Sequence, residues 1–332
     1  MTGAVDFLYG DEDSGRAEER LDVAAQSPAQ LFWRRLRTDR VALLAAALIV
    51  FLVLVAIFAH QVVEIAGARP PNAPSKHFFT VGKVGVPSPT GPSSKNLFGV
   101  DPLGRDLFSR VVYGLRVSLE IALAATGISV LIGLVVGLVA GYYGGWVDTL
   151  LSRLVDVLLA FPILLLALGV ASACSLGHGC VGGLVKPGLS VVIVVIAFVN
   201  WTFIARIVRG QVLSLSKREF VEAACSIGAS NTRIMFREIL PNLVAPLIVY
   251  TTLIIPQNIL LEAALSYLGV GVQPPDPSLG KMLADATDMF DTAWWYMAFP
   301  GAALLLMVLA FNLLGDGLQD AINPRSARAQ AD

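Results

Sequence analysis

Apolar residues along this chain fall in long blocks rather than in the short runs that line the core of a water-soluble domain. The first block, Val41 to Ala59, contains no charged residue. A helix of about 20 residues crosses the hydrocarbon core of a bilayer, which is about 30 Å thick. Five further blocks follow, at about Ile121 to Gly141, Leu150 to Ala173, Leu189 to Ala205, Leu243 to Leu265 and Trp294 to Leu314. The pattern predicts an all-α integral membrane protein with about six transmembrane helices.

The composition narrows the class of protein further. Of the 332 residues, 55% are hydrophobic and 15% are charged, whereas a soluble globular chain carries about a quarter charged residues. Three charged residues fall in or near the predicted spans, namely Arg153 and Asp156 in the third and Glu262 in the fifth. The formal net charge is −1. The chain therefore has no basic excess with which to neutralise phosphates, and a nucleic-acid partner is excluded.

The N-terminal segment differs from the rest of the chain. Residues 1–26 are polar and rich in Asp and Glu, the reverse of the basic start of a signal peptide, and they predict a disordered tail. Ser27 and Pro28 then predict the N-cap and first residue of a helix. The apolar and basic residues 31–37 suit a short helix at the membrane surface, in contact with lipid. Residues 27–63 are thus predicted to form this interfacial helix and the first span.

Lysine and arginine in short loops indicate the orientation, because cytoplasmic loops carry an excess of them. With the N-terminus in the cytoplasm, the two short outer loops hold one lysine each, Lys186 and Lys281. The inner segments then hold Arg34, Arg35, Arg37, Arg40, Arg153, Arg206, Arg209, Lys217, Arg218, Arg233, Arg237, Arg325 and Arg328. We therefore expect both termini inside the cell, with residues 64–116 as a long extracytoplasmic loop and residues 321–332 as a cytoplasmic tail.

The chain lacks the motifs that would let it power transport or catalyse a reaction by itself. No stretch fits the ATP-binding P-loop pattern G-x-x-x-x-G-K-[ST]. No string of acidic residues crosses the predicted spans, as a proton- or sodium-coupled carrier would need. No Ser-His-Asp set or H-E-x-x-H motif is visible among three histidines. The chain is therefore expected not to be an enzyme and to bind no cofactor, and energy for transport would come from another subunit.

A long hydrophilic segment, residues 206–240, separates the fourth and fifth spans. Ser216 and Glu219 form a capping-box pattern that predicts a helix starting just after Ser216. Gly228 predicts the end of that helix and Ser230 the cap of the next. Pro241 suits the start of the fifth membrane helix. One face of the short helix is predicted to be apolar at helical spacing, and its members are Phe220, Ala223, Ala224 and Ile227.

This segment resembles the EAA loop of ABC-importer permeases. The matching residues are Glu222, Ala223 and Ala224, followed by Gly228 and by Pro241. The resemblance implies that the short helix docks into a groove of a cytoplasmic ATPase, with small alanines for close approach, Phe220 and Ile227 as knobs, and Glu222 for an ion pair. An ordinary amphipathic connector ended by glycine is the alternative. The sequence has Glu238 where the family has isoleucine.

Three further segments are similar to one branch of that family, the C-type permeases of dipeptide, oligopeptide and nickel importers. The first, residues 98–110, reads FGVDPLGRDLFSR, with Val100 in place of the usual threonine. The others are residues 262–275, EAALSYLGVGVQPP, and residues 312–325, NLLGDGLQDAINPR. Together with the EAA-like loop, these matches occur in the expected order and extend the resemblance over most of residues 30–325.

The resemblance implies a type I ABC-importer permease in a bacterial inner membrane, with residues 117–320 as a five-helix core. It implies a related B-type permease as heterodimer partner, two ATPase subunits carrying ATP and Mg²⁺, and an extracytoplasmic substrate-binding protein. Di- or oligopeptides are the expected substrates, with nickel or another small solute as the alternative. A secondary carrier and a non-transporting membrane scaffold are candidates from other classes, but neither explains the EAA-like loop.

Polar residues near the outer end of the fifth span form a second candidate site. Gln257, Asn258 and Glu262 lie close together in the sequence, next to Pro256. Polar groups at membrane depth are costly and face a cavity or a partner. One interpretation is that these residues line the translocation path or its outer gate. The other is a hydrogen bond between helices or an anchor at the membrane interface.

The signature before the second span is a third candidate site. Asp101, Arg105, Asp106 and Arg110 predict a cap and ion-pair network that braces the following helix, and Gly104 and Ser109 belong to the same motif. The alternative is a docking surface for the extracytoplasmic binding protein.

The cysteines raise a question of redox and metal chemistry. Cys174 and Cys180 fall in an outer loop, where an oxidising environment favours a disulfide, whereas Cys225 falls in the cytoplasmic helix. His178, between the first two, allows a metal site, but two thiols and one imidazole are a weak ligand set. No metal is therefore expected.

Overall fold

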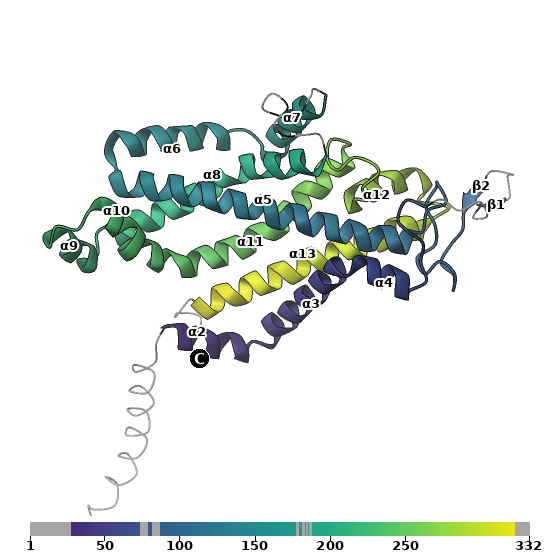
Figure 1. Ribbon diagram of the computed structural model, residues 1–332, viewed down its shortest axis with the longest axis horizontal. Coiled ribbons are helices and arrows are strands. Elements are labelled where there is room, and N and C mark those ends of the chain that lie inside the picture. Colours follow the sequence, from purple (N-terminus) through teal and green to yellow (C-terminus); the bar gives the residue numbers. More distant parts are fainter. Residues whose placement is uncertain are drawn as a thin grey trace, which may run out of the picture.

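The computed structural model describes residues 28–73, 79–81, 87–176, 179–180, 183, 185 and 188–322. This part of the chain is nearly all helical, and its longest helices run roughly parallel (Figure 1). Five of its helical segments are long and apolar enough to cross a membrane, and a sixth span results if a bent pair is counted as one. The five are α3 (Arg40–Ile57), α5 (Leu107–Tyr143), α8 (Leu189–Leu215), α11 (Leu240–Tyr267) with the short segments before it, and α13 (Trp294–Ile322). The predicted fold class is confirmed.

The third predicted span is not one continuous helix. Helix α6 (Gly145–Leu159) and helix α7 (Ile163–Leu176) meet at an 87° bend. Pro162 lies in the break and has no N–H to donate, and its ring disfavours the helical conformation of Phe161 before it. Helix α6 runs back along α5 and α8, while α7 turns across them (Figure 1). The predicted third span, Leu150 to Ala173, therefore corresponds to this bent pair of helices.

The most extensive helix-to-helix contact in the core joins α5 and α8. Glycines at positions 133, 137 and 141 follow one face of α5. At Gly137 a Cβ atom would lie 2.6 Å from the carbonyl oxygen of Ala205, so only glycine lets the two backbones come this near. Small residues at such spacing allow close helix packing in membranes, where apolar burial alone does not drive association.

The N-terminal helices pack along α13. Helix α2 (Pro28–Thr38) lies at the end of the molecule and precedes α3, whose first turn is capped by Asp39 through the backbone N–H groups of Val41 and Ala42. Trp33 is 57% exposed, and the guanidinium of Arg37 lies 5.6 Å from its ring centroid. An exposed tryptophan and basic side chains on one short helix are typical of helices at a membrane surface, and the interfacial position of α2 stays a prediction. Helix α4 (Ala59–Ile65) continues from α3.

The end of the bundle opposite the loop between α8 and α11 holds shorter elements. Strands β1 (Phe79–Val81) and β2 (Pro87–Pro89) form a two-stranded antiparallel sheet that the sequence pattern did not predict. Helix α5 begins at Leu107, inside the range 64–116 expected to be loop. Helix α12 (Leu279–Ala286) and the 3₁₀ turn η3 (Thr287–Met289) connect α11 to α13. Helix α12 packs on α11 and α13 and is capped by Ser278.

Candidate functional site

The loop between α8 and α11 contains helix α9 (Glu219–Ser226), the single turn α10 (Asn231–Arg233) and the π-helix η2 (Ile234–Ile239). Helix α9 begins at Glu219, and its N-cap, Arg218, makes no side-chain cap. The predicted capping box of Ser216 is therefore wrong. Ser216 instead ends α8, where its backbone N–H donates to Val212 O at 2.8 Å and its hydroxyl donates to Leu213 O at 3.2 Å.

Helix α9 has one face buried by its own chain and one face open. Val221 and Ala224 are buried and belong to a cluster with Ile234, Met235 and Ile239 of η2. The prediction that Ala224 belongs to an open apolar face is therefore wrong. The open face consists of Phe220, Ala223 and Ile227, with Glu222 beside them, and we call these four residues the coupling surface. Of its two large apolar side chains, Ile227 is the more open, at 79% exposure.

The turns around α9 follow the sequence signals closely. Gly228 has φ +78°, a conformation that favours glycine, and its N–H donates to Cys225 O at 3.0 Å just past the end of α9. The Ser230 hydroxyl accepts from Arg233 N at 3.4 Å, as expected of a cap. Pro241 lies in the first turn of α11. The predicted end of the short helix and the predicted cap after it are both observed.

The loop is connected firmly to two membrane helices. The Tyr142 hydroxyl at the end of α5 donates to Asn231 Oδ1 at 3.0 Å. On the other side, α10, η2 and α11 form one continuous helical segment from Asn231 to Tyr267. The amide of Asn242 donates to Glu238 O at 2.7 Å, which satisfies a carbonyl near Pro241. The loop is therefore in contact with both α5 and α11.

The polar residues of the fifth span lie on opposite sides of α11. Glu262 is fully buried and accepts hydrogen bonds from three hydroxyls, Ser118 at 2.7 Å, Ser266 at 2.8 Å and Ser278 at 3.1 Å. These bonds join α11 to α5 and to the start of α12. The geometry is that of a hydrogen bond between helices rather than of a side chain facing a path.

Asn258 is buried in the same way. Its amide nitrogen donates to Thr126 Oγ1 of α5 at 2.6 Å, and its oxygen accepts from Asn200 of α8. Asn200 was not singled out from the sequence, although a lone asparagine in an apolar span is a usable signal. Gln257 is exposed. Of the three residues proposed to line a path, Gln257 alone has an open side chain, and the path prediction for Asn258 and Glu262 does not match their burial.

The signature before α5 forms a compact ion-pair network. The loop from Val100 to Asp106 turns like a hairpin, with Gly104 at φ +76°. Asp101 is fully buried and accepts from the backbone N–H of Leu103 at 2.9 Å and of Arg105 at 2.8 Å. The Nε atoms of Arg105 and Arg110 lie 2.6 Å and 3.5 Å from Asp101 Oδ2. Buried charges of opposite sign stabilise this turn, which favours the bracing interpretation.

Asp106 is the N-cap of α5. Its carboxylate accepts from Ser109 N at 2.9 Å, and the Ser109 side chain is buried below it. Burial raises the pKa of Asp106 above its ordinary value, although backbone hydrogen bonds from Ser109 and Phe108 and the charge of Arg69 act in the opposite direction. The Nη1 atom of Arg110 donates to Pro71 O and to Asn72 Oδ1, both at 3.3 Å. The network thus also holds the preceding loop against α5.

Cys174 and Cys180 are joined by a disulfide, with their Cα atoms 4.7 Å apart. Cys225 on α9 is a free, exposed thiol. His178 lies outside the described residues. Among the residues that the structure describes, no group of three His, Cys, Asp or Glu side chains could hold a metal ion.

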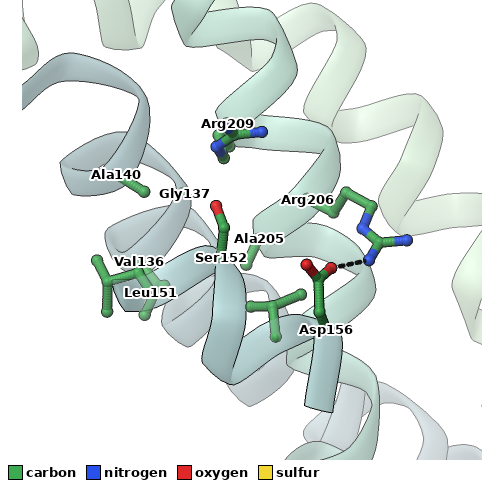
Figure 2. A pocket seen from close by; sticks show the side chains of 10 residues that line it. Val136, Gly137, Ala140, Leu151, Ser152, Asp156, Ala205, Arg206 and Arg209 are labelled. Carbon is green, nitrogen blue, oxygen red and sulfur yellow. Dashed lines mark hydrogen bonds and ion pairs between the residues drawn. The ribbon is translucent and has the colours of Figure 1, made fainter. Parts of the chain in front are cut away.

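Two ion pairs between α6 and α8 were not predicted from the sequence. The Arg209 guanidinium binds both carboxylate oxygens of Asp148, and Arg206 Nη2 lies 2.5 Å from Asp156 Oδ1 (Figure 2). Asp148, Ser152 and Asp156 recur every four residues on one face of α6. That spacing, together with two arginines one helical turn apart directly after the predicted span Leu189 to Ala205, is a signal that could have identified them.

The chain matches known families over most of its length. Residues 133–328 match the family described as binding-protein-dependent transport system inner membrane component. Residues 27–77 match the N-terminal TM domain of oligopeptide transport permease C. These matches place the apolar spans and the loop between α8 and α11 in a defined class: a multi-pass permease subunit of an ABC importer in the inner membrane.

Comparison with individual relatives gives the same class of protein. The chain is 39% identical over 301 residues to the dipeptide transport system permease protein DppC of Alkalihalophilus pseudofirmus, covering 91% of each chain. It is 41% identical over 300 residues to the glutathione transport system permease protein GsiD of Escherichia coli, covering 90% of this chain and 91% of that one. The protein belongs to the family of binding-protein-dependent transport system inner membrane components.

A solved structure supports the fold. An inward-facing conformation of the MetNI methionine ABC transporter matches with a TM-score of 0.54 at 20% identity, and the match covers 65% of this chain and 98% of that chain. At this identity the likeness concerns the fold, which is that of an ABC-importer permease.

Proposed function

We propose that this chain forms half of a peptide-selective translocation pathway and couples it to cytoplasmic ATPases. The observation that carries the peptide assignment is the resemblance to relatives named for dipeptide and glutathione transport, both small peptides, over nine-tenths of the chain. The other half of the pathway would be a related B-type permease. Two ATPase subunits would bind ATP and Mg²⁺, and an extracytoplasmic binding protein would deliver the peptide. The chain itself would catalyse no reaction.

The coupling surface is the proposed contact with the ATPase. Phe220 and Ile227 offer exposed apolar side chains, Ala223 allows close approach, and Glu222 offers a charge. Ala224 supports this surface by packing in the cluster behind it, Gly228 ends the helix, and Pro241 lies in the first turn of α11. The connections of the loop to α5 and α11 provide a route by which ATPase closure would move the membrane helices.

The proposed position of the coupling surface also assigns the remaining segments to a side of the membrane. The loop between α8 and α11 defines the cytoplasmic side, so the Asp101 network and the disulfide lie outside. Residues 1–26 and 321–332 would be cytoplasmic tails, residues 27–63 the interfacial helix and first span, and residues 64–116 mainly extracytoplasmic. Residues 117–320 would form the permease core, with Gln257 as the candidate for the path.

The test is to purify the tagged chain from its native membranes in mild detergent and identify what accompanies it by mass spectrometry. We expect a second permease, P-loop ATPases and a binding protein. The reconstituted complex should then take up radiolabelled dipeptides only with ATP, while nickel does not compete. Isolation of the chain alone, with solute flux in ATP-free vesicles, would contradict the proposal.

A further inference from the structure

A pocket of about 280 Å³ lies between α5, α6 and α8 (Figure 2). One part of its wall is apolar and includes Val136 of α5 and Leu151 of α6. The other part carries charge, with Asp156 on α6 facing Arg206 on α8. Small residues such as Ala205 leave room between these walls. A ligand here would thus contact a negatively charged carboxylate, a positively charged guanidinium and an apolar surface together.

The pocket lies nearer the loop between α8 and α11, and two of the helices that line it, α5 and α8, are long and apolar enough to cross a membrane. Arg206 precedes the end of α8 at Leu215 by nine residues, which is about 14 Å along a helix. The side chains of Arg206 and Asp156 are nevertheless 54% and 52% exposed. Charged side chains within such apolar helices face a water-filled cavity or another protein rather than lipid. The open side of the pocket therefore faces the solute route or the second permease.

The two ion pairs near the pocket differ in how firmly they are held. Arg209 binds Asp148 through two nitrogens, Ser152 also donates to Asp148 at 3.0 Å, and both charged side chains are less exposed, at 34% and 18%. This pair fixes α6 against α8. The pair of Asp156 and Arg206 has one contact and is half exposed. Exposed ion pairs contribute little to stability, so this one can exchange partners at little cost.

We propose that this pocket is a peptide subsite on the inner half of the pathway, in which the charged ends of a zwitterionic peptide replace the internal pair. The ammonium group of the peptide binds Asp156, and its carboxylate binds Arg206. The inference rests on the proposed peptide transport. A lone anion would face Asp156 and a lone cation would face Arg206, whereas a zwitterion leaves neither charge unpaired. An extended dipeptide spans about 7 Å, and the apolar wall can accept different side chains.

The experiment uses the complete complex in nanodiscs without the binding protein. A dipeptide of alanine and a diazirine analogue of leucine is irradiated, and labelled segments are mapped by mass spectrometry. We expect label on α6 and α8 around the pocket. Asp156→Asn and Arg206→Gln should each lower it about tenfold, the loss expected from one charge-assisted hydrogen bond. Glu120→Gln and Arg116→Gln, changes of the same chemistry at exposed positions of α5 away from the pocket, should leave it unchanged.

A second probe tests the assignment of each charge. An N-acetylated form of the dipeptide has no ammonium and carries only a negative charge, so Asp156→Asn should raise its labelling instead of lowering it, while Arg206→Gln should still lower it. Label elsewhere in a complex that imports dipeptides would overturn the subsite and leave the proposed function intact. Label in the pocket that is indifferent to both variants, or an ethanolamine lipid bound there in place of peptide, would also overturn it. Failure of the complex to import any peptide would instead reject the proposed function.

Discussion

The Ser118 hydroxyl on α5 donates to Glu262 on α11 at 2.7 Å, across 144 positions of sequence and with both side chains fully buried. Ser266 and Ser278 supply two further donors to the same carboxylate. One acidic group thereby joins two membrane helices and the start of α12. In an apolar surrounding each of these polar groups is costly without its partner.

Glu262→Ala should therefore destabilise the protein strongly, by about 3 kcal/mol, since it leaves three buried hydroxyls without their acceptor. Ser118→Ala should cost about 1 kcal/mol, because the other two donors remain. Unfolding of the purified permease complex in detergent, followed by tryptophan fluorescence, measures both. Gln257→Ala, an exposed change on the same helix, is the control and should lie within about 0.5 kcal/mol of the wild type. Equal stability of the Glu262→Ala and Gln257→Ala variants would show that the buried network has no structural role.

The coupling surface gives a prediction about assembly rather than stability. Ile227→Asp places a charge at a position that is 79% exposed, so the permease should fold normally but lose its ATPase subunits during purification. Val221→Ala removes buried volume from the opposite face of α9, and it should lower stability by about 1 kcal/mol while the ATPase still binds. Co-purification and thermal unfolding, measured on both variants, separate the two effects. Retention of the ATPase by Ile227→Asp would remove the coupling surface from its proposed role.

Features set by nearby residues could be predicted from the sequence, and features set by packing could not. Gly228 and Ser230 mark the end of one helix and the cap of the next because glycine and serine act on their own backbone within a few positions. The inward position of Ala224 depends on η2, which packs against α9 from outside it. The three hydroxyl partners of Glu262 and the pairing of Asp156 with Arg206 likewise join segments distant in sequence. The bend at Pro162 is an exception, because it was not predicted although Phe161 and Pro162 carry a local signal for it.

Asp106 links helix capping to pH. Burial raises its pKa, so the folded state binds the proton more tightly than the unfolded state does. Its contribution to stability is therefore greatest below the ordinary carboxylate pKa and is lost as the pH rises through the raised value. Asp106→Asn keeps an oxygen for Ser109 N but cannot ionise, and it should flatten this part of the stability profile. Asp106→Ala loses the cap and should cost about 1 kcal/mol. Unfolding measured from pH 4 to about pH 8 tests both changes; an unchanged slope for Asp106→Asn would contradict the assignment.

The three cysteines are predicted to differ in their reactivity toward an alkylating reagent. Alkylation of the folded, unreduced protein with an iodoacetamide reagent should label Cys225 alone, because Cys174 and Cys180 are joined and Cys225 is exposed. Reduction should release two more sites. Replacing both outer cysteines with serine should lower stability by about 2 kcal/mol, the value expected for closing so short a loop. Cys225→Ser, as control, should remove the first label without changing stability. Three labelled cysteines before reduction would show that the disulfide is absent in the membrane.

The closest approach of α5 and α8 can be tested with a single methyl group. Gly137→Ala would place a Cβ atom 2.6 Å from the backbone oxygen of Ala205, which cannot move aside as a side chain could. The helices would have to separate, at a cost of about 2 kcal/mol. Gly127→Ala adds the same methyl to the same helix where no atom lies within 4 Å, so it should stabilise the helix by up to about 1 kcal/mol. Thermal unfolding of the two variants should move in opposite directions, and a similar shift in both would mean that α5 and α8 do not meet at Gly137.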